Sequence, residues 1–138
     1  MIRAILDTNI IVSALLQSEG LPARIFLMAI SGTAMQLCVS GEIYAEYEEV
    51  IRRPHLKRSD DEINAALAAI REKGFWVRPM VQVQACADPD DNVFLECAEA
   101  AQAHYLITGN LKHFPSTWSQ TRIVSPRQFL EAVAEMEG

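Results

Sequence analysis

Short apolar runs alternate with segments of helical periodicity along this chain, and no other sequence feature limits its fold as strongly. The runs have the length of strands buried on both faces of a parallel sheet, and they lie at residues 2–6, 36–39, 105–108 and 123–124. Helical spacing covers residues 9–16, 22–31, 40–52, 59–73, 88–101 and 125–133. A chain in which strands and helices alternate is predicted to form a three-layer α/β/α sandwich with a mostly parallel central sheet.

Two of the helix starts are marked by capping residues. Ser59 with Glu62 three residues later forms a capping-box pattern. Asp88 is expected to cap a later helix, which would place Asp91 at the third position of that helix. The residues between these two helices, from 76 to 83, are expected to be extended.

Length and composition favour one hydrophobic core. The chain has 138 residues, half of them hydrophobic, and no Gly/Ser/Pro-rich linker divides it, so residues 1–138 are expected to form a single domain. Eighteen Asp and Glu against twelve Lys and Arg give a net charge of −6. Such a chain does not grip phosphates over a broad surface. Any contact with nucleic acid must be local, or part of the negative charge belongs to a metal site.

The N-terminus and the cysteines indicate a cytoplasmic protein. Asp7 interrupts the apolar run that begins at Ile2, too early for a signal peptide or a membrane span. The three cysteines, Cys38, Cys86 and Cys97, are odd in number and lack metal-ligand spacing. They are expected to be buried free thiols in a reducing compartment.

Four side chains are expected to meet at the carboxyl edge of the sheet. Asp7 follows the first strand and Asn110 follows the third, and ligands of open α/β sheets bind outside the carboxyl ends of the strands. Glu46 lies beside the apolar stripe of its helix, where a carboxylate seldom sits without a partner. Asp91 lies near the start of a later helix. The topology directs Asp7, Asp91 and Asn110 to one edge, with Glu46 near enough to join them.

Each of these residues also has an ordinary explanation. Asp7 and Asp88 could cap helices, and Asp91 could act on a helix dipole. Glu46 could be one surface glutamate in a helix that is rich in them, and Asn110 could belong to a plain loop. A functional site is therefore indicated by the convergence of these residues and not by any one of them.

Several carboxylates that pack together predict a divalent cation. They repel one another and stay ionised at neutral pH only if a cation offsets that repulsion. Oxygen ligands alone favour Mg²⁺ or Mn²⁺, and such ions suit phosphodiester hydrolysis because they activate water and stabilise the leaving oxygen. Further oxygen and nitrogen atoms beside the acids are expected to support the site, and they come from Thr8, Asn9, Asp88 and Thr108.

Taken together, these residues make the chain resemble the PIN-domain family, and within it the bacterial toxin components of toxin–antitoxin pairs. The resemblance is carried by Leu6–Asn9, Ser40–Pro54, Asp88–Leu95 and Thr108–Asn110. It implies a metal-dependent endoribonuclease that cuts single-stranded RNA, a cognate antitoxin that holds it inactive, and often a homodimer.

The same resemblance implies roles for individual residues. Asp7, Glu46 and Asp91 match the acids that bind the metal in this family. Asn110 matches a fourth catalytic position, where many PIN domains have aspartate. One negative charge is therefore missing here, which would reduce the affinity for a second ion.

Three features of the sequence have more than one interpretation. The densest basic stretch could contact RNA phosphates or could be a solvated loop, and it contains Arg52, Arg53, His55, Lys57 and Arg58. Because Asn110 replaces an acid, the chain could instead be a catalytically weak or inactive module that binds RNA or protein. A phosphatase of the haloacid-dehalogenase type also has aspartate after its first strand, but Asn9 stands where that class needs a second aspartate as acid and base.

Overall fold

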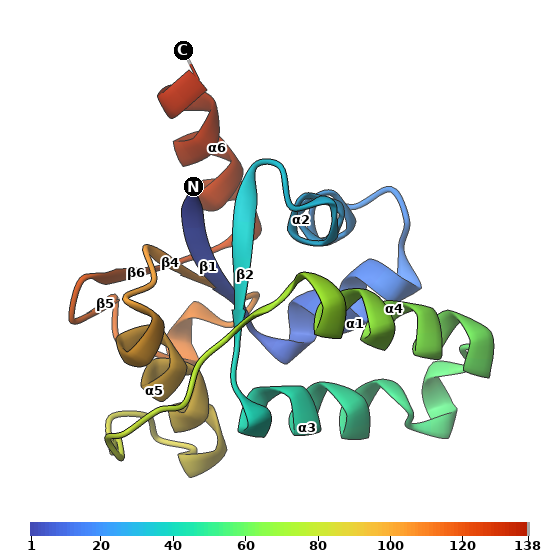
Figure 1. Ribbon diagram of the computed structural model, residues 1–138, viewed down its shortest axis with the longest axis horizontal. Helices are drawn as coiled ribbons and strands as arrows, with labels where there is room; N and C mark the ends of the chain where they lie inside the picture. The colour runs from blue at the N-terminus through green and yellow to red at the C-terminus, as the bar shows by residue number, and fades with distance from the viewer. Residues whose placement is uncertain (138) are drawn as a thin grey trace.

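The computed structural model of the protein describes residues 1–137 (Figure 1). Its strands are β1 (Ile2–Leu6), β2 (Met35–Val39), β3 (Phe75–Trp76), β4 (Tyr105–Ile107), β5 (Thr117–Trp118) and β6 (Thr121–Val124). Its α-helices are α1 (Thr8–Leu16), α2 (Leu21–Ser31), α3 (Gly41–Ile51), α4 (Asp60–Lys73), α5 (Asn92–Ala101) and α6 (Pro126–Glu137). Short 3₁₀ turns lie at Pro54–Leu56 (η1), Pro89–Asp91 (η2) and Leu111–His113 (η3).

The strands form one sheet in the order β3-β2-β1-β4-β6-β5. All neighbouring strands pair in parallel except β5, which pairs antiparallel with β6. Leu6 at the end of β1 is in register with Ile107 at the end of β4. The residues that follow these two strands, Asp7 and Thr108, therefore leave the sheet side by side, as the parallel topology predicts.

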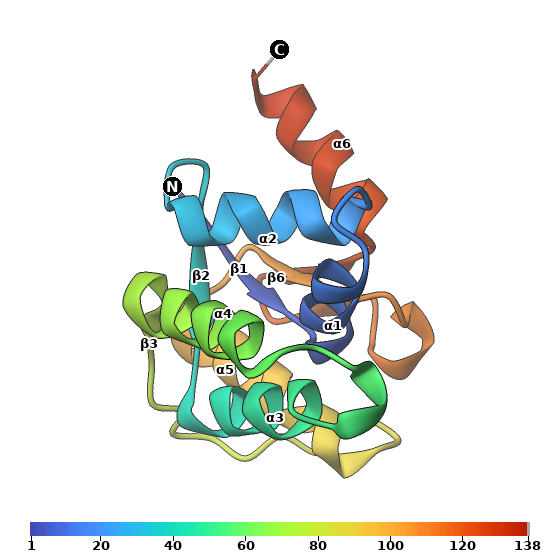
Figure 2. The same ribbon diagram turned by 90° about the vertical axis from the view of Figure 1, so that its right-hand side faces the viewer.

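Helices cover both faces of the sheet, so the predicted three-layer α/β/α architecture is confirmed. Helices α1, α2 and α4 lie on one side of β1 and β2, and α5 lies on the other (Figures 1 and 2). Helix α6 packs on β4 and β6 and against α2. Helix α3 runs across the carboxyl end of the sheet and contacts α1 and α5 (Figure 1).

The core fixes α3 on β1. Tyr47 on α3 is fully buried, and its hydroxyl donates a hydrogen bond to the carbonyl of Leu6. Ile43 and Ile51, one turn to either side of it, are also fully buried. Helix α3 is therefore attached to the end of β1 by packing and by one directional bond, which sets the position of everything that α3 carries.

Two sequence expectations about local structure were wrong. Asp88 does not cap α5, because its side chain accepts from the backbone N–H of Asp90 within the 3₁₀ turn η2, and α5 begins only at Asn92, with Asp91 at its N-cap position. Residues 76–83 are not a continuous extended segment, since β3 ends at Trp76. Pairing with β2 ends there, so the following residues have no neighbouring strand to keep them regular.

The three cysteines are free thiols, as expected, but only two of them are buried. Cys38 and Cys97 are buried, whereas Cys86 is half-buried. Burial raises the pKa of Cys38 to about 11 and that of Cys97 to about 12, so both are thiols at neutral pH.

Within residues 1–137 no single helix is long and apolar enough to cross a membrane, and the one pair of helices that would qualify together, α1 and α2, is bent by 107°.

Substitution of Tyr47 by Phe tests how α3 is held. The change removes the hydroxyl that bonds to Leu6 and leaves the packing of the ring, so the free energy of unfolding should fall by about 1–2 kcal/mol in urea titrations. Tyr44→Phe, which removes a hydroxyl of the same helix whose bond from Arg71 is open to solvent, should change it by less than about 0.5 kcal/mol. Equal losses in the two variants would mean that the buried bond adds nothing to stability.

Candidate functional site

The predicted acids meet in one cleft at the carboxyl edge of the sheet. Asp7 comes from the end of β1, Glu46 from α3, Asp91 from the junction of η2 and α5, and Asn110 from the turn after β4. The cleft has a volume of about 350 Å³. It is lined by Asp7, Thr8, Asn9, Val12, Glu46, Val50, Asp88, Asp90, Asp91, Asn110 and His113. Of the predicted catalytic and supporting residues, Thr108 alone is not in this lining, and it contacts Asp7 from behind, while the predicted basic residues lie outside the cleft.

Asp7 is the most constrained residue of the cleft. Its side chain is 6% exposed and caps α1, with Oδ1 accepting from the backbone N–H of Thr8 at 2.7 Å. Oδ2 accepts from the hydroxyl of Thr108 at 2.7 Å and from Nδ2 of Asn9 at 3.0 Å. A carboxylate has about four lone-pair sites. Three are used, so about one remains for a ligand in the cleft.

Two of these donors also tie the ends of β1 and β4 together. The hydroxyl oxygen of Thr108 accepts from the backbone N–H of Asn110 at 2.9 Å, and Oδ1 of Asn9 accepts from the backbone N–H of Gly109 at 3.1 Å. A Cβ at Gly109 would lie 3.4 Å from Oδ1 of Asn9, so glycine allows this close approach. Asn9 and Thr108 thus hold Asp7 in place, Asn9 from the lining of the cleft and Thr108 from behind it.

Glu46 is joined to the same network through Thr8. The hydroxyl of Thr8 donates to Oε2 of Glu46, and the carboxylate is half-buried. Glu46 directly precedes Tyr47, the residue that fixes α3 on β1. The interpretation of Glu46 as an isolated surface glutamate is therefore wrong, because its carboxylate faces Thr8 and the other acids.

Asp91 and Asn110 form the more open side of the cleft. Asp91 makes no side-chain capping bond to α5, and its Oδ2 lies 3.7 Å from Nδ1 of His113. Asn110 is exposed, and no hydrogen bond of its side-chain amide is found within residues 1–137. Sequence reasoning did not select His113, because its place at the cleft depends on the 3₁₀ turn η3, which no periodicity marks.

Burial, and then the neighbouring acids, raise the pKa values of the three carboxyl groups. Burial raises the pKa of Asp7, hydrogen bonds from Thr108 and Thr8 oppose the rise, and the charge of Glu46 adds to it. Burial also raises the pKa of Glu46, against the hydrogen bond from Thr8, and the charge of Asp91 adds to the rise. Burial and then the charge of Asp7 raise the pKa of Asp91. The cleft therefore carries a concentration of negative charge that its own hydrogen bonds do not fully offset.

The donor set fits a hard divalent cation in chemistry and charge. Asp7, Glu46 and Asp91 offer carboxylate oxygens, and their pKa values are raised first by burial and then by the neighbouring acids, both of which a bound cation would offset. In the conformation described, no group of three or more His, Cys, Asp or Glu side chains among residues 1–137 is gathered closely enough to hold a metal ion. Hydrogen bonds hold Asp7 and one oxygen of Glu46, whereas Asp91 makes no side-chain capping bond.

The predicted basic stretch is largely paired with acids. Arg52 lies 3.5 Å from Glu48, Arg53 lies 2.8 Å from Glu49, and Arg58 lies 3.8 Å from Glu62. These are exposed i,i+4 pairs, which reduce the charge available to a phosphate. Lys57, in the left-handed conformation after η1, completes the stretch. Its role in RNA binding stays a prediction.

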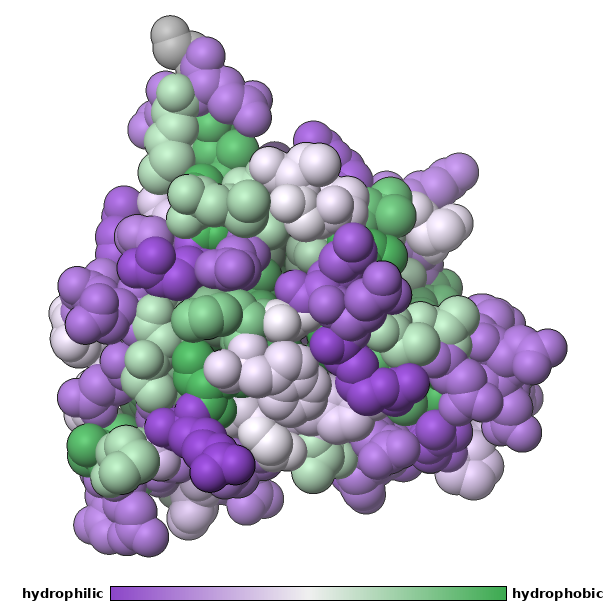
Figure 3. All heavy atoms as spheres, viewed as in Figure 1, coloured by the Kyte–Doolittle hydropathy of each residue, from purple (hydrophilic) through white to green (hydrophobic). Residues whose placement is uncertain are grey.

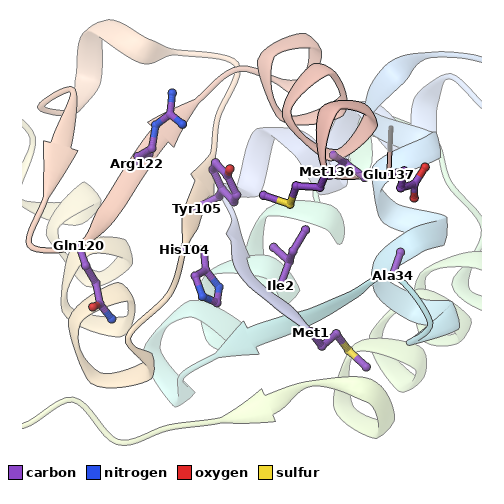
Figure 4. A pocket seen from close by; sticks show the side chains of 10 residues that line it. Met1, Ile2, Ala34, His104, Tyr105, Gln120, Arg122, Met136 and Glu137 are labelled. Atoms are coloured by element: carbon purple, nitrogen blue, oxygen red, sulfur yellow. The ribbon is translucent and has the colours of Figure 1, made fainter.

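A larger cavity, of about 590 Å³, lies at the other end of the strands, beside the N-terminus of β1 and the last turns of α6 (Figure 4). His104, Tyr105 and Arg122 face it together with the apolar side chains of Ile2 and Met136 (Figure 4). It holds none of the predicted acids and lies away from the edge where parallel strands place their ligands. We therefore assign the candidate site to the acidic cleft.

Comparisons with known proteins show what the chain as a whole is similar to. A family model described as PIN domain matches residues 3–112. An uncharacterized protein of Methanocaldococcus jannaschii, MJ1680, is 24% identical over 142 residues, which cover 94% of this chain and 90% of that protein. Among solved structures, the crystal structure of VapBC2 from Rickettsia felis bound to a DNA fragment from their promoter has a TM-score of 0.60 at 14% identity, covering 90% of this chain and 98% of the other. At that identity the structural likeness concerns the fold.

The raised pKa of Glu46 predicts how stability depends on pH without metal. Because the folded-state pKa lies above the unfolded value, ionisation of Glu46 destabilises the fold, a cost that is absent at low pH and grows as pH rises through the raised pKa. In EDTA, Glu46→Gln should therefore gain stability over the parent chain between about pH 4 and pH 7 in urea titrations. The exposed Glu99→Gln should show no such trend. If the parent chain instead became more stable relative to Glu46→Gln as pH rises, the claim that ionised Glu46 destabilises the fold would be wrong.

Proposed function

The chain belongs to the PIN-domain family, and we propose that it is a metal-dependent endoribonuclease that hydrolyses phosphodiester bonds of single-stranded RNA. The observation that carries this proposal is the convergence of Asp7, Glu46 and Asp91, from three separate elements, in one cleft where each carboxylate has a raised pKa. Asp7 also caps α1, but like charges packed together oppose folding, which favours a functional reason for the cluster.

In the proposed mechanism Asp7, Glu46 and Asp91 would hold Mg²⁺ or Mn²⁺. The bound ion would offset the charge of the acids, lower the pKa of an attacking water and stabilise the leaving oxygen. No side-chain nucleophile is needed.

The chain's own residues orient this site. Thr108, Asn9 and the backbone of Thr8 fix both oxygens of Asp7, so that little reorganisation is needed when a ligand arrives. The hydroxyl of Thr8 fixes one oxygen of Glu46 and leaves the other to the cleft. These are positioning roles.

Asn110 and His113 border the open side and would contact the substrate. The amide of Asn110 is uncharged and can donate to a phosphate oxygen that an aspartate would repel. His113 lies beside Asp91, where its imidazole could orient a phosphate or a water. With Asn110 in place of an acid, the cleft has three charges at its centre, which favours one tightly held ion over two.

The biological role that we propose is that of a toxin in a toxin–antitoxin pair in the cytoplasm. It is supported by the resemblance of the sequence to such toxins and by the shared fold with the VapBC2 structure. A cognate antitoxin protein and a homodimer are part of this proposal. The four-residue basic set Arg52, Arg53, Lys57 and Arg58 is proposed as an RNA contact of secondary importance, because three of its members are paired with glutamates.

The second candidate function is a PIN-fold module that binds RNA or protein without turnover. It is favoured by Asn110, which removes one acid, and by the absence within residues 1–137 of a preformed metal group. The two proposals differ in whether the cleft binds a divalent ion.

Metal binding is predicted to stabilise the protein. Mn²⁺ or Mg²⁺ at about 100 times its Kd should add about 2.7 kcal/mol, or roughly 8 °C in Tm for a chain of this length, measured by differential scanning fluorimetry at neutral pH. Asp7→Asn should lose most of this shift, because it removes the best-fixed ligand. An equal shift in the parent chain and in Asp7→Asn would exclude the cleft as the binding site.

RNA cleavage is predicted to need both the metal and Asp91. The purified chain should cut a mixed-sequence single-stranded RNA in Mn²⁺ or Mg²⁺ and not in EDTA, and Asp91→Asn from a parallel preparation should lose at least about 100-fold in rate. Asp61→Asn, on the exposed start of α4, is the matched control and should cut normally. Cleavage that survives in Asp91→Asn points to a contaminating nuclease. No cleavage with any ion, combined with no metal binding by calorimetry, would favour the binding module.

A further inference from the structure

An exposed aromatic cluster lies at the edge of the sheet formed by β3. Phe75 is 40% exposed and Trp76 is 43% exposed, although both are strand residues. Tyr44 of α3 packs on Trp76 with ring centroids 5.4 Å apart and planes tilted by 55°. Aromatic rings of this size are seldom left open to solvent when core positions are available, so the exposure invites a functional explanation.

The indole is held in place although its ring is exposed. Nε1 of Trp76 donates to the carbonyl of Arg71 at 3.2 Å, one of the last carbonyls of α4. The guanidinium of Arg71 in turn lies 5.9 Å from the centre of the Tyr44 ring and donates to its hydroxyl. Because these contacts already hold the side chain of Trp76, a ligand that stacks on it costs little side-chain conformational entropy, which favours binding.

A hollow lies beside Trp76 and is large enough for a nucleotide. Its volume is about 580 Å³, within the usual range of small-ligand sites. It is lined by Gly41, Glu42, Trp76, Val77, Arg78 and Pro79. The hollow thus combines an aromatic ring with one cation and one carboxylate.

The local charge differs from that of the chain as a whole. Arg71, Lys73 and Arg78 surround the aromatic cluster, against Glu42 and Glu72, whereas the whole chain has a net charge of −6. Within residues 1–137 Arg78 has no ion-pair partner, unlike the arginines of the basic stretch. Figure 3 shows this face, with pale residues of near-neutral hydropathy next to strongly hydrophilic ones around its centre.

We propose that this surface, the Trp76 platform (Tyr44, Phe75, Trp76 and Arg78), anchors single-stranded RNA by stacking a base on Trp76 while Arg78 contacts a phosphate. Stacking platforms flanked by cations are how proteins hold single strands without reading their sequence. Glu42 is placed to accept from the amino groups of a stacked base and to disfavour bases that lack them. This inference rests on the proposed function, because it names a second contact for the same substrate.

The platform lies on the other side of α3 from the acidic cleft. In Figure 2, β3 lies at one side of the molecule and the turn Leu111–His113, which borders the cleft, lies at the opposite side. A single RNA strand must therefore pass around the end of the sheet to reach both the platform and the cleft. Substrates of a few nucleotides cannot do so, whereas longer RNAs can occupy the platform and the cleft together.

Fluorescence tests the platform directly, because the chain has two tryptophans. In Trp118→Phe the remaining emission comes from Trp76, and a twelve-nucleotide single-stranded RNA in EDTA should quench it. By anisotropy with the same labelled RNA, Trp76→Ala should bind about 5- to 100-fold more weakly, the range that stacking of one base supplies. Arg78→Gln should weaken binding and lower its salt dependence. Trp118→Phe alone should bind like the parent chain.

The outcomes separate this inference from the proposed function. Loss of cleavage in Asp91→Asn, with RNA binding unchanged in Trp76→Ala and in Arg78→Gln, would overturn the platform and leave the nuclease intact. Trp76-dependent RNA binding in a parent chain that never cleaves would support the platform and overturn the nuclease. If Trp76→Ala changed the sedimentation coefficient of the protein without changing RNA binding, the surface would serve protein association and the RNA platform would be wrong. Should Trp76→Ala fail to fold, quenching and Arg78→Gln still decide.

Discussion

The carboxylate of Asp7 joins the elements that build this site, and it does so as a buried charge. It caps α1 through the backbone of Thr8 and accepts from Thr108 at the end of β4, so β1, α1 and β4 meet at two oxygen atoms. A carboxylate that is 6% exposed costs stability unless its lone pairs are satisfied. Asn9 supplies the third donor while its own oxygen holds Gly109, so the cost of the charge is reduced by the same bonds that fix the turn.

The remaining acids add repulsion that these bonds do not remove, and the fold tolerates it because their helices are held elsewhere. Helix α3 is held through the fully buried Tyr47, one residue beyond Glu46, and α5 through the fully buried Phe94, three residues beyond Asp91. Packing of large side chains next to each acid therefore keeps the carboxylates together against their charge. Stability and the chemistry of the cleft act against each other at this point, as at many functional sites.

The sequence predicted the position of the site better than its local geometry. Parallel topology alone brings Asp7 and Asn110 to one edge, because every parallel strand ends there, and the apolar stripe of α3 brings Glu46 near them. The start of α5 was misplaced, since Asp88 can cap a 3₁₀ turn as well as an α-helix and the two cannot be told apart from a pattern of acids and proline. The position of His113 and the hydrogen bonds of Asn9 depend on how the turns after β4 meet η2 and the start of α1, for which one sequence carries no periodic signal.

The net charge of −6 also has a structural explanation that composition could not give. Five acids line the cleft, because Asp88 and Asp90 lie there with Asp7, Glu46 and Asp91. Three arginines of the basic stretch after α3 are paired with glutamates of α3 and α4. Arg71, Lys73 and Arg78, near the far edge of the sheet, form no ion pair within residues 1–137. An RNA strand would thus meet repulsion at the cleft until a cation is bound there, and attraction at β3 before that. Electrostatics of this kind would let a strongly acidic chain bind RNA first at the platform and reach the cleft only with its metal.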